Sequence, residues 1–241
     1  MLQRSIIQID MFLEHRMRHA ATLTNLLFRP RRADGRRPIG GFCKRGFDIV
    51  GAVLALALLS PLLLMLAFLV KLSDGGSALF GHRRVGRNGK SFVCLKFRTM
   101  AQNGDELLQA HFERNPRGRE EWLATRKLQD DPRVTRVGLV LRKLSLDELP
   151  QLLNILRGEM SFVGPRPVVE DELELYGPAV ECYLKSRPGL TGLWQISGRN
   201  DVSYNARVAF DQQYVENWSF VFDLVIIIKT FPAVLSSRGS Y

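Results

Sequence analysis

Ile49–Val70 reads IVGAVLALALLSPLLLMLAFLV, and these 22 consecutive residues contain no charged side chain. As a helix the stretch would measure roughly 33 Å, enough to cross the hydrocarbon core of a bilayer. Ser60-Pro61 interrupts it at the middle, where the proline removes a backbone donor and its ring crowds the carbonyl of Ala57. Each half matches about the depth of one leaflet, so a helix–break–helix hairpin can enter and leave one face of a membrane.

Basic residues flank this apolar stretch on both sides. Residues 1–46 hold ten basic and three acidic side chains, and a second basic run begins at Lys71 and continues through residues 82–98. Basic flanks of membrane segments stay on the cytoplasmic side, and a single crossing would place one of the two flanks outside. The charges therefore favour re-entry, and a proline-kinked single span is the alternative that they leave open.

The composition bounds the class of protein. The chain has 241 residues, a formal charge of +10, 46% hydrophobic and 24% charged residues, which excludes a wholly disordered chain and a polytopic transporter. Its length fits one domain plus a tail or an anchor. Cys43, Cys94 and Cys182 are too widely spaced for a metal knuckle or a disulfide framework, which predicts a reducing compartment.

The pattern predicts three parts: an Arg-rich extension over residues 1–41, a broken membrane helix over 42–72 that either re-enters or spans, and a helix-rich α/β domain over 73–241. Within the domain we expect short strands at residues 78–80 and 91–97 around a GRNGK turn, and an amphipathic helix over 146–157 closed by a glycine. Residues 219–235 are apolar but contain Asp223, Lys229 and Pro232. They predict an amphipathic segment that lies on the membrane or covers the core, and not a second span.

An acidic pair, Asp147-Glu148, follows two cations in the stretch RKLSLDELPQ at 142–151. Ser145 and Glu148 have the spacing of a capping box, which explains Glu148 structurally and Asp147 less well. Beside Arg142 and Lys143 we expect the carboxylate to be ionised. Such a group can be a nucleophile toward phosphorus or a ligand of Mg²⁺.

Cations and glycines gather in the loops that follow. Arg166 lies between two prolines, which lowers the ordering cost of presenting its guanidinium. The Gly-rich residues 187–201 can offer backbone N–H groups and Arg199 to phosphates, and Trp194 to a nucleobase. Lys96 and Arg98 fall on one side of a strand. For all of these, solvated side chains on turns and an exposed strand face are the alternative.

Together these features describe a membrane-attached domain with several arginines and one acidic pair. They fit chemistry on a phosphate-bearing substrate at a membrane surface, or a non-catalytic basic scaffold that binds anionic lipids. We expect no nucleic-acid partner, because acids interleave with the basic residues after residue 100 and the sequence contains no stacking module.

Several motifs, in order along residues 42–236, resemble those of the bacterial sugar transferase family, the monotopic polyprenyl-phosphate hexose-1-phosphate transferases. They are KRGFD at 44–48, KFRTM at 96–100, DPRVTRVG at 131–138, LRKLSLDELPQLLNILRGEMSFVGPRP at 141–167 and RPGLTGLWQISGR at 187–199. In overall size the chain is similar to the short exopolysaccharide-production members.

The resemblance implies an enzyme of the bacterial inner membrane, on its cytoplasmic face. It would transfer a sugar-1-phosphate from a UDP-sugar to undecaprenyl phosphate, release UMP, and perform the first membrane step of exopolysaccharide synthesis. The sugar is left open among galactose, glucose and an N-acetylated amino sugar, and so is a homo-oligomer.

The resemblance also implies roles for individual residues. Asp147 would be the nucleophile that holds a covalent phospho-sugar, and Glu148 the second acid, with both as candidate Mg²⁺ ligands. Arg142 and Arg166 match the family's phosphate-clamping arginines, and Ser60-Pro61 matches the break of its re-entrant helix, which enters and exits on the cytoplasmic face. With the residues singled out above, the candidate phosphate-binding set is Arg142, Arg166, Lys96, Arg98 and Arg199, and the candidate nucleotide loop includes Thr191, Trp194 and Gln195.

Overall fold

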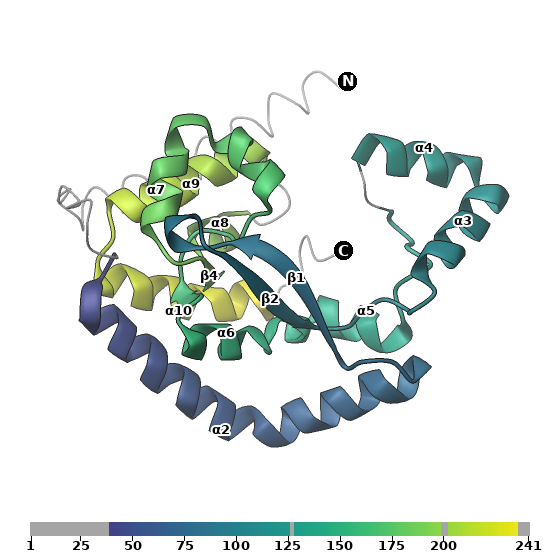
Figure 1. The fold of residues 1–241 in the computed structure, drawn as a ribbon, viewed down its shortest axis with the longest axis horizontal. Coiled ribbons are helices and arrows are strands. Elements are labelled where there is room, and N and C mark those ends of the chain that lie inside the picture. The colour runs from purple at the N-terminus through teal and green to yellow at the C-terminus, as the bar shows by residue number, and fades with distance from the viewer. Residues whose placement is uncertain (1–38, 126–127, 199–201, 236–241) are drawn as a thin grey trace.

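The computed structural model describes residues 39–125, 128–198 and 202–235, so most of the Arg-rich extension lies outside the described residues. A helix-rich α/β body lies on one long helix, α2 (Gly41–Asp74). Figure 1 shows α2 bowed beneath the body, with both of its ends turned toward it. The predicted fold class, helix-rich α/β, is confirmed.

The remaining elements follow α2 in chain order. They are β1 (Leu79–Val85), a 3-10 turn (Arg87–Gly89), β2 (Ser91–Phe97), α3 (Gly104–Arg114), α4 (Pro116–Thr125), α5 (Arg136–Lys143), a 3-10 turn (Leu146–Glu148), α6 (Gln151–Arg157), β3 (Ser161–Val163), a 3-10 segment (Glu170–Ala179), α7 (Val180–Lys185), β4 (Gly189–Thr191), α8 (Leu193–Ser197), α9 (Tyr204–Glu216) and α10 (Phe220–Leu235).

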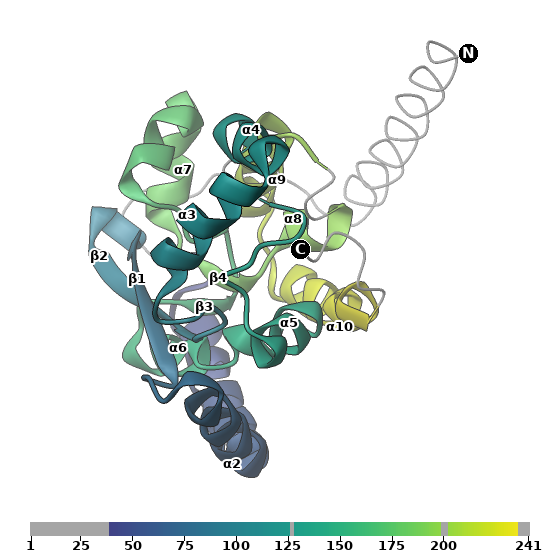
Figure 2. The same cartoon turned by 90° about the vertical axis from the view of Figure 1, so that its right-hand side faces the viewer.

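The strands form two small sheets. β1 and β2 are an antiparallel hairpin in which Phe80 pairs with Lys96 and Arg84 with Phe92. β3 and β4 pair in parallel. The second predicted strand, 91–97, is confirmed, but β1 extends five residues beyond the predicted 78–80. Figures 1 and 2 both show the hairpin leaving the C-terminal end of α2 and running away from that helix.

The predicted break of α2 at Ser60-Pro61 is wrong as a helix end, because α2 continues through Pro61. A proline leaves the carbonyl four residues earlier, here that of Ala57, without its backbone donor. The Ser60 hydroxyl donates to this Ala57 carbonyl at 2.9 Å. The serine thus replaces the lost hydrogen bond, and the helix bends without ending.

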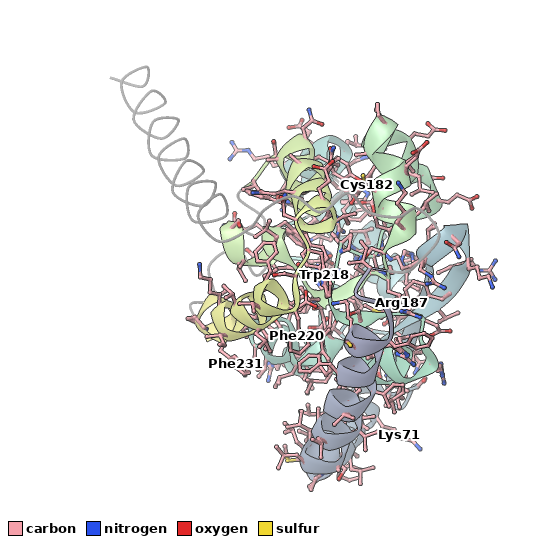
Figure 3. The ribbon with its side chains drawn as sticks, turned by 90° about the vertical axis from the view of Figure 1, so that its left-hand side faces the viewer. Lys71, Cys182, Arg187, Trp218, Phe220 and Phe231 are labelled. Carbon is pink, nitrogen blue, oxygen red and sulfur yellow. The ribbon has the colours of Figure 1, made fainter. Side chains whose placement is uncertain are left out.

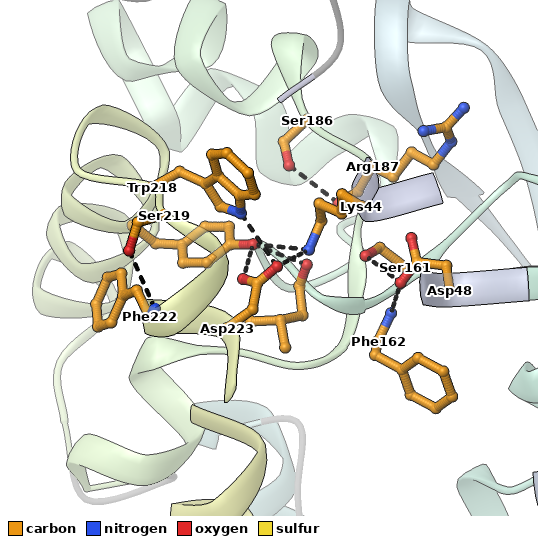
Figure 4. A network of polar contacts seen from close by, with 12 residues as sticks. Lys44, Asp48, Ser161, Phe162, Ser186, Arg187, Trp218, Ser219, Phe222 and Asp223 are labelled. Atoms are coloured by element: carbon orange, nitrogen blue, oxygen red, sulfur yellow. Dashed lines mark hydrogen bonds and ion pairs between the residues drawn. The ribbon is translucent and has the colours of Figure 1, made fainter. Parts of the chain in front are cut away.

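Polar side chains fix the N-terminal end of α2 to the body (Figure 4). Lys44 donates to Asp223 of α10 at 2.5 Å, and Asp48 accepts from the Ser161 hydroxyl and the Phe162 backbone at 3.0 and 3.1 Å. Arg45 donates to two carbonyls at the end of α6, groups that a helix terminus leaves without partners.

The C-terminal end of α2 is held in the same way. Asp74 pairs with Arg98, which follows β2, and accepts from the Gln102 backbone. Between the two ends, Ala52, Leu66 and Val70 are buried against the body. Both ends of the apolar helix therefore lie on one body of protein.

The outer face of α2 is apolar and exposed, and α10 continues this surface. Leu58 and Phe68 are 80% and 61% exposed, and Phe231 of α10 is 68% exposed. Figure 3 shows α2 and α10 on the same side of the body, with Phe220 and Phe231 on α10. The expected amphipathic character of α10 is not confirmed, because its exposed face is apolar too, while Phe222, Asp223 and Ile226 face the core. Among the described residues only α2 is long and apolar enough to span a membrane.

The predicted helix over residues 146–157 is divided in two. Leu146–Glu148 forms a 3-10 turn, and α6 begins only after Pro150, at Gln151. Its expected closure by Gly158 is confirmed, with φ at 82°. The division matters because it puts the acidic pair on a tight turn and not on the side of a regular helix.

Candidate active site

A cavity of about 660 Å³ lies between the β1–β2 hairpin, the acidic turn and the loops after β3 and β4. Most of the charged residues singled out by the sequence line it. The charged lining side chains are Arg84, Lys96, Arg98, Arg142, Asp147, Glu148 and Arg166, and Trp194 and Gln195 lie beside them.

The acidic pair is held by an unusual backbone. Ser145, just before the turn, has φ at 54°, in the left-handed region, which a non-glycine residue adopts at a cost of about 1–3 kcal/mol. The expected capping box is wrong, since the Ser145 side chain makes no cap hydrogen bond. Glu148 is thus left without the structural explanation that the sequence offered, and both carboxylates are available to the cavity.

Lys96 links the two carboxylates. Its Nζ lies 2.6 Å from Glu148 Oε1 and 3.8 Å from Asp147 Oδ2. Burial alone would lower the pKa of Lys96, but the two carboxylates outweigh it and raise that pKa. Lys96 is therefore a fixed positive charge at neutral pH, close to the atom of Asp147 that would attack a substrate.

Asp147 is buried, and burial raises its pKa to about 6; Lys96 and Arg142 oppose the rise and Glu148 adds to it. The expectation that flanking cations simply favour the ionised form is thus incomplete, because desolvation is the largest effect and Lys143 points to solvent. At neutral pH the carboxylate is still mostly ionised. A desolvated carboxylate of this kind is more basic, and a better nucleophile, than one in water.

Arg142 and Arg98 occupy the side of the cavity nearest α2. Arg142 Nε donates to the Thr99 hydroxyl at 2.9 Å, and Leu141 beside it packs against α2. Arg98 pairs with Asp74 at the C-terminal end of α2, so this ion pair partly neutralises its charge. Arg142 has no such acidic partner at hydrogen-bond distance among the described contacts, and its guanidinium is the freer of the two for an anion.

Arg166 lies at another part of the cavity wall. Its Nη1 is 3.6 Å from Glu172, its guanidinium lies 5.9 Å from the centre of the Trp194 ring, and its backbone N–H donates to Asp211 at 3.3 Å. Tyr176 also donates to Asp211, at 2.7 Å. Asp211 therefore holds the backbone of Arg166 in place, a contact that the flanking prolines did not predict.

The nucleotide loop is only partly brought to the cavity. Trp194 lines it but is 92% buried, with the guanidinium of Arg207 over its ring, so a stacked base would find little of the ring. Gln195 lines the cavity, and its Oε1 has no partner. Thr191 lies outside the lining and hydrogen-bonds Thr230 of α10 at 2.8 Å. Arg199 lies outside the described residues.

The donor set of the acidic turn fits a magnesium ion that is shared with a substrate. No group of three or more His, Cys, Asp or Glu side chains suited to a metal occurs in the described part of the chain. Mg²⁺ at nucleotide sites is commonly held by one or two carboxylates and completes its shell with water and phosphate oxygens. Lys96 contacts one oxygen of Glu148, which leaves the other oxygen and Asp147 as ligands.

Among the charged residues that line the cavity in the described part of the chain, Arg84 of β1 is the one to which the sequence pattern assigned no site role. It follows His82 and Arg83 in the basic run that flanks the apolar stretch, for which the sequence pattern predicts only a membrane flank. The signal was present: residues 80, 82 and 84 alternate with their neighbours, and the hairpin register puts them on the face that contains Lys96.

Comparisons with known proteins agree with these features. Residues 39–237 match the model of one family, bacterial sugar transferase. The chain is 69% identical over 218 residues to the exopolysaccharide production protein ExoY of Sinorhizobium fredii, covering 90% of this chain and 96% of that one. It is 52% identical over 200 residues to an undecaprenyl-phosphate galactose phosphotransferase of Salmonella typhimurium, covering 83% and 42%. It is 41% identical over 208 residues to a UDP-glucose:undecaprenyl-phosphate glucose-1-phosphate transferase of Caulobacter vibrioides, covering 82% and 72%.

Proposed function

The chain belongs to the bacterial sugar transferase family, and on that premise we propose that it moves a hexose-1-phosphate from a UDP-sugar to undecaprenyl phosphate. The relatives whose names state a reaction act on undecaprenyl phosphate with galactose or glucose, and one similar over nearly its whole length is named for exopolysaccharide production. The proposed role is therefore the first membrane step in making such a polysaccharide.

One observation carries the chemistry: the buried Asp147 carboxylate, with its pKa raised to about 6, lies 3.8 Å from the Lys96 ammonium in a cavity lined by arginines. A surface ion pair would not be desolvated in this way. A raised pKa suits a general acid or base as well as a nucleophile, but neither attacking group in the proposed reaction has to lose a proton, because a carboxylate and a phosphate are already anions. The role that remains for a desolvated carboxylate among cations is that of a nucleophile toward phosphorus.

In the first step, Asp147 attacks the phosphorus that carries the sugar. An Oδ–P bond forms, the bond to the bridging oxygen of the diphosphate breaks, and that oxygen leaves with its electron pair as part of UMP. Lys96 and Arg142 lie where the charge of the phosphoryl group would gather, and fixed cations in a desolvated cavity stabilise it without reorganising.

In the second step, a phosphate oxygen of undecaprenyl phosphate attacks the same phosphorus. The Asp147–phosphorus bond breaks, Asp147 is returned as a carboxylate, and the product is undecaprenyl diphosphate sugar. No net proton transfer to the protein is needed, because both nucleophiles are oxyanions. Glu148, held by Lys96, orients the ammonium toward Asp147 in both steps.

Asp147 and Glu148 are also the residues that would hold a Mg²⁺ ion together with the donor's phosphates, and the chemistry of that ion is to offset the negative charge of the leaving UMP. The support is the pair of carboxylates in a cavity otherwise lined by cations.

For the membrane, we propose re-entry of α2 from the cytoplasmic face of the inner membrane. The two ends of α2 contact one body, through Lys44 and through Asp74, so a crossing would require pulling one end off. The exposed outer face is apolar near the bend, where Leu58 and Leu64 are 80% and 73% exposed. Bending at Pro61 therefore lets the middle of the helix dip into the lipid while both ends stay outside it.

Thiol labelling tests the topology. Cys43 and Ser73 are exposed near the two ends of α2, so Cys43 and a Ser73→Cys variant, with the other cysteines replaced, report each end. A membrane-impermeant maleimide should label both in inverted vesicles and neither in intact cells. Labelling of the two ends from opposite sides would contradict re-entry.

Release of UMP tests the reaction. The detergent-purified chain is incubated with Mg²⁺ and a panel of UDP-sugars, with and without undecaprenyl phosphate. We expect turnover with one sugar that depends on the lipid and on Asp147. If no sugar supports release while the folded protein still binds anionic vesicles, the chain is a basic membrane scaffold and the proposal fails.

A further inference from the structure

Arg84 faces the same cavity as the acidic pair, but from the far part of the hairpin. Phe80 and Arg84 of β1 line the cavity with Cys94 and Lys96 of β2, because alternate residues of paired strands share a face. Arg83, the next residue back, points to the opposite face and is exposed. The strand thus carries two adjacent arginines of which one belongs to the cavity.

The Arg84 guanidinium has two contacts with the segment that follows β3. Nη1 donates to the Pro167 carbonyl at 3.3 Å and lies 3.7 Å from Glu172 Oε2. The other oxygen of Glu172 lies 3.6 Å from Arg166. Two guanidiniums therefore share a single carboxylate, and both distances exceed the 2.7–2.9 Å or so of a direct charge-assisted hydrogen bond.

The charges at this point do not balance within the protein. Arg84 and Arg166 carry two positive charges against one negative charge on Glu172, and both arginines line the cavity whereas Glu172 does not. Burial and the nearby Arg166 both lower the pKa of Arg84, although an arginine stays charged at any pH of interest. Each of the two guanidiniums has five N–H donors, and the contacts above use few of them, so the others can donate to a ligand. The surplus is one positive charge, and a singly charged phosphate group, such as either phosphate of a nucleotide sugar, has the matching charge and acceptors.

The position along the strand separates two phosphate ligands. Arg84 lies four residues beyond Phe80, the partner of Lys96, and so about 13 Å farther along the strand. β1 starts at the membrane helix and runs away from it (Figures 1 and 2). With α2 in the membrane as proposed above, a lipid phosphate at headgroup level would reach the Lys96 and Arg142 end of the cavity first. The Arg84 and Arg166 end would then face a soluble ligand.

We propose that Arg84 binds the phosphate next to the uridine in the donor and in UMP, as the second guanidinium of a pair with Arg166, and that Glu172 positions the two forks. This rests on the proposed function, since it takes a uridine nucleotide as the ligand. Arg84 is then a nucleotide-binding residue, distinct from Lys96 and Arg142, which serve the reacting phosphorus.

Equilibrium titration of the full-length protein in nanodiscs tests this with two ligands, UMP and uridine, that differ only in the phosphate. The variants are Arg84→Gln and, as the matched control on the same strand, Arg83→Gln. We expect Arg84→Gln to weaken UMP binding about 10- to 100-fold, as for loss of a charged hydrogen-bond pair, and to leave uridine binding within twofold. Arg83→Gln should change neither.

Turnover supplies a second readout. Arg84→Gln should raise KM for the UDP-sugar by a similar factor and leave KM for undecaprenyl phosphate unchanged. Unaltered UMP binding, equal losses of UMP and uridine binding, or a rise in KM for the lipid would each overturn the proposal, because Arg84 would then serve the fold, the base or the acceptor. If the wild-type protein binds neither UMP nor a UDP-sugar, the proposed function itself fails and this inference falls with it.

Discussion

Two clusters in this molecule pair a lysine with carboxylates, and they differ in burial and in how many of the carboxylate oxygens already have a donor. At the start of α2, Lys44 and Asp223 are 94% and 99% buried, and Asp223 also accepts from Tyr214 and Trp218 at 2.7 and 3.0 Å. In the cavity, Lys96 and Glu148 are 34% and 36% exposed, and Asp147 lies 3.8 Å from the lysine.

The two clusters differ in how many hydrogen bonds the carboxylate accepts, and this decides whether it can take part in chemistry. Every oxygen of Asp223 is occupied by a donor of the same chain, so this pair fastens the membrane helix and has no capacity for a ligand. Asp147 is desolvated, and the Lys96 ammonium lies 3.8 Å from its carboxylate, beyond hydrogen-bond distance, so the carboxylate keeps the basicity that a nucleophile needs. On the proposed function, similar residue types thus serve as a structural ion pair in one place and as a nucleophilic site in the other, depending on how many hydrogen bonds the carboxylate accepts.

Asp147→Asn should have the largest effect on activity. The amide keeps the shape but cannot form the phospho-sugar ester, so turnover should fall by about 10⁴-fold or more. The free energy of unfolding at pH 8 should not fall. Burial raises the pKa of Asp147 above its ordinary value, so its charge destabilises the folded state above pH 6, and the neutral amide removes that cost. UMP release and thermal unfolding in detergent measure the two effects; residual turnover above 1% would refute the nucleophile.

Asp223→Ala should reverse this pattern. It leaves the Lys44 charge buried and unpaired, which should cost about 3–5 kcal/mol of stability and loosen α2 from the body. Chemical denaturation of the purified protein gives the value. A double variant, Lys44→Met with Asp223→Leu, removes both charges and should recover most of the loss; if it is as unstable as Asp223→Ala, the pair is not what fastens the helix.

Lys96→Met should reduce turnover about 10²-fold, because a fixed cation beside the reacting phosphorus is lost. It should also raise the pKa of Asp147, since Lys96 opposes the effect of burial there. The acidic limb of the pH–rate profile should accordingly move to higher pH in the variant. A lower rate with an unmoved limb would mean that Lys96 does not act on Asp147.

Lowering the pH should have the smallest effect in the wild type. The nucleophile must be ionised, and its pKa is raised to about 6, so the rate of UMP formation should be nearly level above pH 7 and fall about fivefold from pH 6 to pH 5. An unshifted aspartate would hold its rate down to about pH 5. Values of kcat/KM for the donor, which report the free enzyme, distinguish the two, and the folded fraction measured at each pH excludes unfolding as the cause.

Local patterns predicted the parts of this account that depend on neighbours in the sequence. The uncharged stretch predicted α2, and the acids after Arg142 predicted the acidic turn. Two features could not be predicted in this way. One is the left-handed backbone of Ser145, with which no capping box forms, and the other is the Ser60 hydrogen bond that lets the helix continue past Pro61. The residue types permit each of these conformations but do not require it.

Contacts between distant segments were equally hidden. Lys44 and Asp223 are 179 residues apart, and the local pattern around Asp223 shows only a charge in an apolar segment. Arg84 lines the cavity because β1 extends beyond the predicted strand and pairs with β2 in a register that puts Arg84 on the same face as Lys96. Periodicity alone gives the face of a residue but not what that face meets.

The central claim is that Asp147 carries the sugar-phosphate between the two substrates, and a trapping experiment tests it most directly. The protein is incubated with the UDP-sugar that supports turnover, without undecaprenyl phosphate, and the intact mass and the peptide containing Asp147 are measured. We predict that one sugar-phosphate is added at Asp147 as one UMP is released, and that Asp147→Asn gives neither. UMP release that occurs only when the lipid is present, with no adduct at any time, would contradict the account and indicate direct transfer between the two substrates.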